Sequence, residues 1–312
     1  MAPAPLAHRL TLVLISSLIF TALVVLQVGL ILTGGAVRLT GSGLGCPTWP
    51  RCTPGSFKPI PHQVQGQLHA WIEFTNRLLT FVLFFVALAA LIGAFKWGKS
   101  RLEYRRIRAL AILQILGILG QGVLGGITVL THLNPIPVAG HFLLTVALIA
   151  GSVSLRALMA GKIKVEITRM SFRLSRGLAG LTLLVIVLGT IVTGSGPHAG
   201  DIKARRFGID PRTISWIHAD AVIALISLTL GLLLIVKVSE SVQAKTVFGK
   251  QLRLFLIVSL AQGTIGYIQY FTKLPELIVA THLLGSGLVW VAMWNLIARS
   301  KEEAAKSHTE TD

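Results

Sequence analysis

Four histidines lie within long apolar stretches of this 312-residue chain, where an ionisable side chain rarely occurs without a function. They are His69, His141, His218 and His282. A neutral imidazole can bind a heme iron, and two imidazoles at the same depth can bind one iron from both faces. The alternative is that each imidazole only forms a hydrogen bond across a helix interface.

The chain repeats itself, and the repeat includes two of these histidines. Residues 119–143 align with residues 260–284 at a constant offset and without a gap. A second repeat, Thr-Gly-Ser-Gly, occurs at 40–43 and at 193–196, each time at the end of a long apolar run. Apolar similarity alone would not align polar positions, so we infer two related halves. The matches include Gln121/Gln262, Gly122/Gly263, Gly125/Gly266, Thr131/Thr272 and His141/His282.

The composition is that of an integral membrane protein, with 53% apolar and 13% charged residues. A hydrocarbon core of about 30 Å needs about 20 apolar residues per helix. We predict an all-α polytopic fold of eight transmembrane helices, arranged as two parallel four-helix bundles in residues 1–168 and 169–312. The first apolar run is too long for a removable signal peptide, so we expect it to be retained. The predicted helices are 11–33, 68–95, 107–130, 137–160, 174–194, 213–236, 251–271 and 276–298.

The distribution of basic residues predicts the orientation. If the N-terminus is cytoplasmic, 20 of the 29 lysines and arginines fall on the cytoplasmic side, as the positive-inside rule requires. We therefore expect a multi-pass protein of the plasma membrane with both termini in the cytoplasm. The net charge of +17 is explained by this bias and by attraction to anionic lipids, so no nucleic-acid partner is expected.

Spacing along the chain places three of the four histidines at similar depth. His141, His218 and His282 lie 17 to 21 residues before a basic residue at the far end of their helices, as does Asn76, whereas His69 lies 27 residues before one. Asn76 and His141 are 65 residues apart, and His218 and His282 are 64 apart. We therefore expect His218 and His282, on neighbouring helices, to bind a heme iron, and His141 with Asn76 to form a more open site. A shorter local match would instead equate His69 with His218.

A carboxylate lies close to Asn76 in the sequence. Glu73 is one helical turn from both Asn76 and His69, so these side chains share one helix face. His69 lies about 10 Å further out than Asn76 at 1.5 Å per residue. A carboxylate and an imidazole near the iron could move protons. Alternatively, Glu73 and Arg77 only pair with each other, which lowers the cost of their burial.

The two cysteines of the chain, Cys46 and Cys52, fall in the first external loop. An oxidising compartment permits a disulfide there. The bond would be either structural or redox-active, because small strained loops can have labile potentials. His62, His132 and His198 lie in external loops or at helix ends, where we expect solvated surface residues.

Ordered motifs in both halves resemble heme A synthase, and the likeness extends over essentially all eight predicted helices. The motifs are Gly-Gly-Ala-Val-Arg-Leu-Thr-Gly-Ser-Gly-Leu-Gly-Cys-Pro at 34–47, Trp-Pro-Arg-Cys at 49–52, Trp-Ile-Glu at 71–73, and Thr-Gly-Ser-Gly-Pro-His-Ala-Gly-Asp at 193–201.

The resemblance implies a membrane oxidoreductase that converts a ring methyl group of heme O to the formyl group of heme A, through an alcohol, for terminal oxidases. It implies heme b on His218 and His282, with electrons leaving through that heme. It also implies a heme O site at Glu73 and His141. Asn76 departs from the family's commoner histidine, and His69 could substitute for it if its helix slides or tilts. A protein that makes heme O and terminal oxidase assembly proteins are the implied partners.

Two other classes are compatible with the same residues. A non-enzymatic b-type cytochrome would share the histidine pairs but would more naturally keep both halves alike. A heme, porphyrin or solute transporter would explain the repeat and the buried polar groups. Arginines of the loop at 194–212, among them Arg205 and Arg206, either are solvated or pair with heme propionates together with Arg38.

Overall fold

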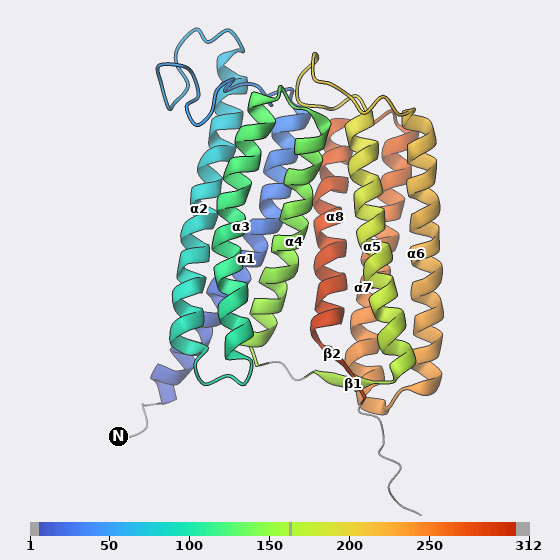
Figure 1. Cartoon of the computed structure of the whole chain (residues 1–312). Helices are drawn as coiled ribbons and strands as arrows, with labels where there is room; N and C mark the ends of the chain where they lie inside the picture. Colours follow the sequence, from blue (N-terminus) through green and yellow to red (C-terminus); the bar gives the residue numbers. More distant parts are fainter. Residues whose placement is uncertain (1–5, 162–163, 304–312) are drawn as a thin grey trace, which may run out of the picture.

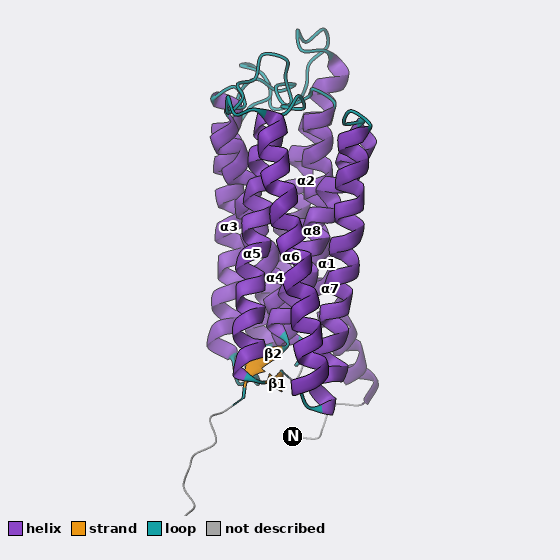
Figure 2. Ribbon diagram, turned by 90° about the vertical axis from the view of Figure 1, so that its right-hand side faces the viewer, coloured by secondary structure: helices purple, strands orange, loops and turns teal. Residues whose placement is uncertain are grey.

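The computed structural model describes residues 6–161 and 164–303 as eight long helices and two short strands. The helices run side by side, with the longer loops at one end and the strands at the other (Figures 1 and 2). The chain ends that we expect in the cytoplasm, residues 1–5 and 304–312, lie outside the described residues. The elements are α1 Leu6–Leu39, α2 Gln67–Trp97, α3 Tyr104–Leu130, α4 Pro135–Met159, β1 Val165–Ile167, α5 Arg169–Ser195, α6 Pro211–Ser239, α7 Val242–Phe271, α8 Glu276–Ala298 and β2 Ser300–Glu302.

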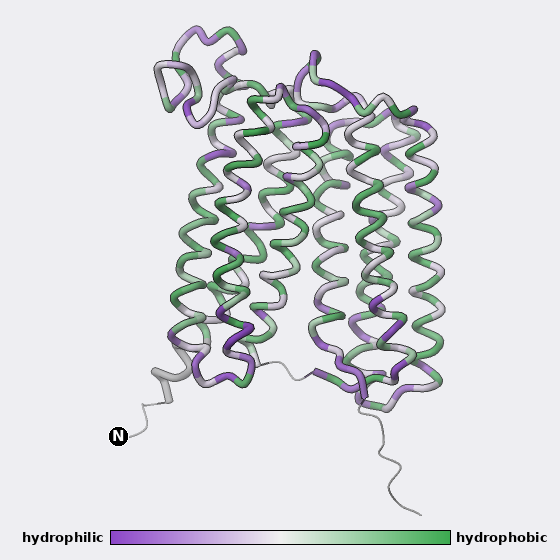
Figure 3. Tube along the Cα trace, in the orientation of Figure 1, coloured by the Kyte–Doolittle hydropathy of each residue, from purple (hydrophilic) through white to green (hydrophobic). Residues whose placement is uncertain are grey.

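The prediction of eight transmembrane helices is confirmed, because eight helices are long and apolar enough to cross a membrane. Several extend beyond the predicted limits. α1 continues to Leu39, and α7 begins at Val242 rather than at 251. Apolar residues follow the middle of each helix and polar residues gather toward the ends (Figure 3). Hydropathy therefore locates only the part of each helix that lies in hydrocarbon, whereas the helical backbone continues into the polar interface.

Local signals fix where several helices begin. Asn134 and Asp210 each accept a hydrogen bond from a main-chain N–H in the first turn of α4 and α6, and a proline follows each cap. This is a favourable N-terminal arrangement, because proline supplies a helical φ and lacks the N–H that would be unpaired. α2 follows Gly66 and has no side-chain cap.

Each half forms a ring of four helices. α2 packs on α1 and α3, and α4 packs on the same two helices; α6 and α8 pack in the same way on α5 and α7. α6 and α8 therefore stand at opposite corners of their ring rather than next to each other. The expectation that the paired histidines lie on neighbouring helices is wrong, because spacing along the chain gives depth but not the order of helices around a bundle.

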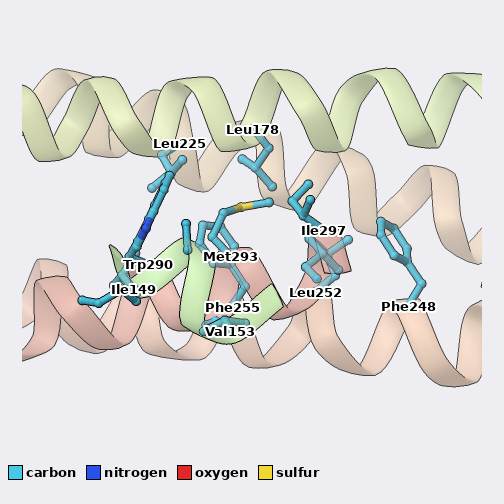
Figure 4. Packing of buried hydrophobic residues seen from close by; sticks show 14 of the residues in the cluster. Ile149, Val153, Leu178, Leu225, Phe248, Leu252, Phe255, Trp290, Met293 and Ile297 are labelled. Carbon is cyan, nitrogen blue, oxygen red and sulfur yellow. The ribbon is translucent and has the colours of Figure 1, made fainter. Parts of the chain in front are cut away.

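The two halves meet along α4 and α8, with α1 also packing on α8. Trp290 of α8 donates from Nε1 to the carbonyl oxygen of Val146 at 2.7 Å, and Trp294 donates to Ser154 Oγ at 2.6 Å. Figure 4 shows Trp290 and Met293 of α8 among apolar side chains of both halves. The halves thus share one cluster of buried apolar residues, while a second cluster lies within α1–α4.

A short parallel sheet closes the end opposite the long loops. β1 pairs with β2, with Val165 opposite Ser300. Beside it, the buried carboxylate of Glu240 accepts hydrogen bonds from the main-chain N–H of Thr168 at 3.0 Å and from its hydroxyl at 2.7 Å. Strands of three residues are too short to give an alternating pattern, so this sheet was not predicted.

Candidate functional site

A cavity of about 1670 Å³ extends through the interior of both halves. Ligand pockets commonly measure about 300–1,000 Å³, so this space exceeds what one small ligand fills. Most of its wall is apolar, and polar side chains of both halves are set into it. They include Asn76, Gln121 and His141 in the first half and His218, Gln262 and His282 in the second.

In the second half, two histidines reach this cavity from opposite corners of the ring. His218 lies on α6 and His282 on α8. Both rings are largely buried, and the Nδ1 atom of each has no hydrogen-bond partner among the described residues. Because the Nδ1 atoms are inaccessible, an added group would bind through the other ring nitrogen, Nε2, which is not among the buried unpaired atoms.

Glycines on the adjoining helices make room for these imidazoles. A Cβ at Gly189 would lie 3.3 Å from His218 Cε1, and a Cβ at Gly266 would lie 3.1 Å from His282 Cε1. Both distances are tighter than ordinary packing contacts. Each imidazole therefore lies directly against the backbone of the preceding helix, which limits its rotation.

The first half repeats this arrangement at one corner only. A Cβ at Gly125 would lie 3.3 Å from His141 Nε2, so Gly125 faces His141 in the way that Gly266 faces His282. At the opposite corner α2 presents Asn76, whose Oδ1 is buried without a partner in the described part of the chain. The structure brings Asn76 and His141 to the same cavity, with one imidazole where the second half has two.

Two glutamines of the repeat tie the histidine-bearing helices to their neighbours. Gln121 Nε2 donates to the main-chain oxygen of His141 at 3.1 Å, and Gln262 Nε2 donates to that of His282 at 2.8 Å. Gln121 also donates to Thr145 Oγ1 at 2.7 Å. The sequence marks these glutamines as repeated, but it does not show that they bond to the histidine residues themselves.

Glu73 lines the cavity and is fully engaged in hydrogen bonds. It is only 5% exposed. Its Oε1 accepts from Arg77 Nη2 at 2.5 Å, and its Oε2 accepts from the main-chain N–H of Cys46 at 2.6 Å. Glu73 and Arg77 are thus paired, as one of the two predicted alternatives requires. Glu73 also holds the loop between α1 and α2 through the N–H of Cys46.

His69 lies apart from this group. Its Nδ1 is 2.9 Å from Ser42 Oγ, and the residue is not among those that line the cavity. Gly45 explains the close approach of the loop to this turn of α2, because a Cβ there would collide with the main chain of His69. The structure therefore brings Glu73 and Asn76 to the cavity but not His69.

The loop between α1 and α2 lies over the first half (Figure 1). The structure joins Cys46 to Cys52 through their sulfur atoms. Trp49, inside this loop, lines the cavity and lies on Gly126 of α3, where a Cβ would be 2.6 Å from the indole. Nothing in the sequence indicates that a loop tryptophan reaches the cavity.

The arginines near the external end mostly bind main-chain oxygens. Arg38 donates to the carbonyl oxygen of Thr193 at 2.7 Å and also to that of His198. Arg206 donates to Gly196 O at 2.8 Å. These bonds hold the loop after α5, and Arg38 additionally links it to the first half.

His198 is not a solvated surface residue. It lines the cavity, and its Nε2 lies 3.0 Å from the main-chain oxygen of Leu274. Within the described residues, no group of three or more His, Cys, Asp or Glu side chains is placed to hold a metal ion. Two imidazoles that reach one cavity from opposite corners suit an iron that brings its own equatorial ligands, as heme does.

Comparison with known proteins agrees with this geometry. Residues 17–200, more than half of the chain, match the family model COX15-CtaA, described as cytochrome oxidase assembly protein. A protein named heme A synthase from Geobacillus thermodenitrificans is 31% identical over 102 residues, which cover 33% of this chain and 29% of that protein.

Two further relatives carry the same name. The one from Shewanella oneidensis is 32% identical over 149 residues, which cover 43% of this chain and 41% of the relative. The one from Methylobacterium sp. strain 4-46 is 32% identical over 199 residues, which cover 54% of this chain and 55% of the relative. The matches thus span from under a third to about half the length of these relatives. On the family match, the chain is a multi-pass membrane protein that belongs to the COX15-CtaA family of cytochrome oxidase assembly proteins.

Proposed function

We propose that this protein is a heme A synthase, a membrane oxidoreductase that converts a ring methyl group of heme O to a formyl group. The observation that carries the proposal is the asymmetry of the cavity. The second half presents His218 and His282 from opposite corners, whereas the first half presents His141 opposite Asn76. A site with two imidazoles suits a permanent cofactor, and a site with one imidazole suits a substrate that must leave.

Heme b fits the second half, residues 169–312. The Nδ1 atoms of His218 and His282 are buried beside Gly189 and Gly266, which leaves Nε2 of each imidazole available to a ligand in a largely apolar cavity. We assign His218 and His282 as its iron ligands. When bound there, heme b would supply a one-electron carrier whose potential depends on these ligands and their surroundings.

We assign the first half, residues 1–168, to the substrate heme O. His141 would bind its iron on one face, with Gln121 and Gly125 fixing the position of that imidazole. Asn76 would lie on the other face, and because an amide is a poor iron ligand, that face stays free of a strong protein ligand. His69 is not assigned as a ligand, because it is hydrogen-bonded to Ser42 away from the cavity.

Glu73 would act at the edge of the substrate site as a fixed carboxylate. Its two oxygens are held by Arg77 and by the N–H of Cys46, so its position relative to Asn76 is determined by α2 and by the external loop together. A carboxylate held in this way can accept or orient a proton close to the substrate. We also propose that the Cys46–Cys52 disulfide forms in the molecule, as expected on an external face.

We also propose that the end of the bundle with β1 and β2 faces the cytoplasm, because the basic residues are in excess on that side. Arg212 lines the cavity near its external end and is exposed. We propose that Arg212, rather than the engaged Arg206, meets a heme propionate there, because a guanidinium pairs well with a carboxylate. Arg38 also lines the cavity, but its bonds to main-chain oxygens already fix it. A heme O-producing enzyme and terminal oxidase assembly proteins are the proposed partners.

Extraction of hemes from membranes tests this function. The full chain is expressed in a host that makes heme O but lacks a heme A pathway, and the extracted hemes are separated by chromatography. Heme A or its hydroxylated precursor is the expected product. Heme b with unmodified heme O, where an active control makes heme A, would instead identify a cytochrome or heme carrier, and the absence of any bound heme would favour transport.

A further inference from the structure

The first external loop places an aromatic ring over one half of the cavity only. Trp49 lines the cavity and lies on Gly126 of α3, where a Cβ would be 2.6 Å from Cδ2 and 2.8 Å from Cε2 of the indole. No side chain larger than that of glycine fits at position 126 without moving the ring. Trp49 nevertheless remains 42% exposed, so contacts with the rest of the protein cover only part of it.

α2 holds the main chain on both sides of Trp49. Arg77 donates to the carbonyl oxygens of Cys46 at 2.9 Å, Thr48 at 3.2 Å and Arg51 at 3.3 Å. Its partner Glu73 accepts from the N–H of Cys46. The position of the indole is therefore set by a buried ion pair of the helix that also carries Asn76.

Aromatic rings also line the second-half part of the cavity, but they stand on helices α6 and α7 rather than on a loop; they are Trp216, Tyr267, Tyr270 and Phe271. The loop after α5 carries Phe207, which packs against Gly194 but is not among the residues that line the cavity. Hydrogen bonds from Arg206 to main-chain oxygens hold this loop instead. Among the described residues, the half to which we assign the substrate is thus the one in which a loop tryptophan reaches the cavity.

We propose that Trp49 is a substrate-binding residue that covers the external end of the first-half site, and that the Glu73–Arg77 pair positions it. The inference rests on the proposed function for the identity of the ligand, an iron porphyrin. An indole suits this task, because it offers a large flat apolar face and keeps a polar N–H at its edge. A cover held by loop hydrogen bonds rather than by burial can move aside when a substrate enters and when the product leaves.

This assignment gives Glu73 a second role that can be separated from proton transfer. If Glu73 only moves protons, its removal changes turnover and leaves the retention of heme O unchanged. If it also positions Trp49, its removal speeds the release of heme O even when no turnover takes place. The two effects are therefore measured in different experiments.

The test measures the release of heme O from the purified full chain to excess apomyoglobin, without oxygen or an electron acceptor so that no turnover occurs. We expect Trp49→Ala to release heme O about tenfold faster than the wild type and Trp49→Phe to show a smaller increase, since interface changes act mainly on dissociation. The spectrum of the second-half heme serves as the check that each variant is folded, and it should not change.

Two glycines of α3 provide a matched pair. Gly126→Ala should displace the indole and speed release as Trp49→Ala does. Gly120→Ala should behave as the wild type, because a Cβ there meets Leu144 at an ordinary 3.5 Å. A third variant, Glu73→Ala, should also speed release, and combining it with Trp49→Ala should add little, because both changes remove the same contact.

If Trp49→Ala releases heme O at the wild-type rate while the second-half heme is intact, Trp49 does not cover the site. Equal effects of Gly126→Ala and Gly120→Ala would lead to the same conclusion. Additive effects of Glu73→Ala and Trp49→Ala would retain the cover but reject its positioning by the ion pair. If the wild type binds no heme O at all, the proposed function itself fails, which is a different result from heme O binding that does not depend on Trp49.

Discussion

The two halves differ most at one corner of their rings. α8 and α4 carry equivalent histidines, each against a glycine and each bonded through its main-chain oxygen to a repeated glutamine. α6 carries His218 where α2 carries Asn76. The histidine on the fourth helix occurs in both halves, whereas the one on the second helix occurs only in the second half. The second half, which has both imidazoles, therefore fits a permanent ligand better.

A second difference lies in the loops at one end of the bundle. The loop of the first half is joined by a disulfide, is bonded to Glu73 and Arg77, and sends Trp49 into the cavity. The loop of the second half is held by Arg38 and Arg206 through main-chain oxygens. The repeat thus preserves the helices that form the cavity, while its ligand corner and its cover differ between the halves.

Removal of one imidazole from the second half should have the largest effect. We expect His282→Ala or His218→Ala to abolish the six-coordinate low-spin heme, with a loss of affinity greater than about a hundredfold, because a direct iron ligand is lost. A reduced-minus-oxidised spectrum of the purified protein measures this. Asn76→Ala is the control and should leave that spectrum unchanged. A six-coordinate spectrum that survives in both histidine variants would show that His218 and His282 are not the iron ligands, and the proposed difference between the halves would fail.

Restoring the missing imidazole should make the halves alike. Asn76→His places a second imidazole opposite His141, so bound heme O should become low-spin and dissociate tens of times more slowly. The spectrum of the chain loaded with heme O reports the change. His69→Ala serves as the companion variant. A loss of heme O in His69→Ala would show that α2 shifts to bring this residue to the iron.

The glutamines test whether the retained corner works in the same way in both halves. Gln262→Met should weaken second-half heme binding about tenfold and shift its redox potential, and Gln121→Met should weaken heme O binding to a similar extent, as expected for groups that orient ligands. Gln114→Met is the matched control, because Gln114 bonds to the main-chain oxygen of Leu148 instead of that of a histidine. A potential that shifts equally in all three variants would indicate a general packing effect.

The smallest predicted effect is on the melting temperature and arises from the N-terminal cap of α6, which α2 lacks. Asp210 caps α6 through the hydroxyl and N–H of Thr213, and these bonds lower the pKa of Asp210 below its usual value. A lowered pKa means that the stabilising effect is present above the pKa of unfolded Asp, about 3.9, and is lost as the pH falls through the folded value. Asp210→Ala should lower the melting temperature at neutral pH by about 2 °C or less.

The cap of α6 has no counterpart in α2, which begins after Gly66. The difference in melting temperature between the wild type and Asp210→Ala should therefore shrink when both are measured at a pH low enough to protonate Asp210. A difference that stays constant from neutral pH to such acid conditions would mean that the carboxylate does not act as the cap.

Sequence reasoning found the eight helices because apolar runs depend only on distance along the chain. Counting from basic residues predicts one common depth for Asn76, His141, His218 and His282, and the structure brings all four to one cavity. The order of helices around each ring is a tertiary property. It follows from packing on α1, α5 and the seam at Trp290, which the repeat alone does not encode.

Loop residues were the least accessible to prediction. His198 was expected to be solvated, yet it lines the cavity because the loop after α5 folds inward to bond with Leu274. Trp49 was visible only as part of a motif. In both cases the side chain is positioned by contacts with distant segments, and irregular loops have no periodicity from which such contacts can be inferred.

The small sheet has a consequence for the order in which the molecule is completed. β1 precedes α5, whereas β2 follows α8, and the two strands pair in parallel. During synthesis β1 must therefore wait, with its edge unpaired, until every helix of the second half has been made. Pairing of residues 165–167 with 300–302 is then a closing event in biogenesis, one that can occur only after all eight helices have been synthesised.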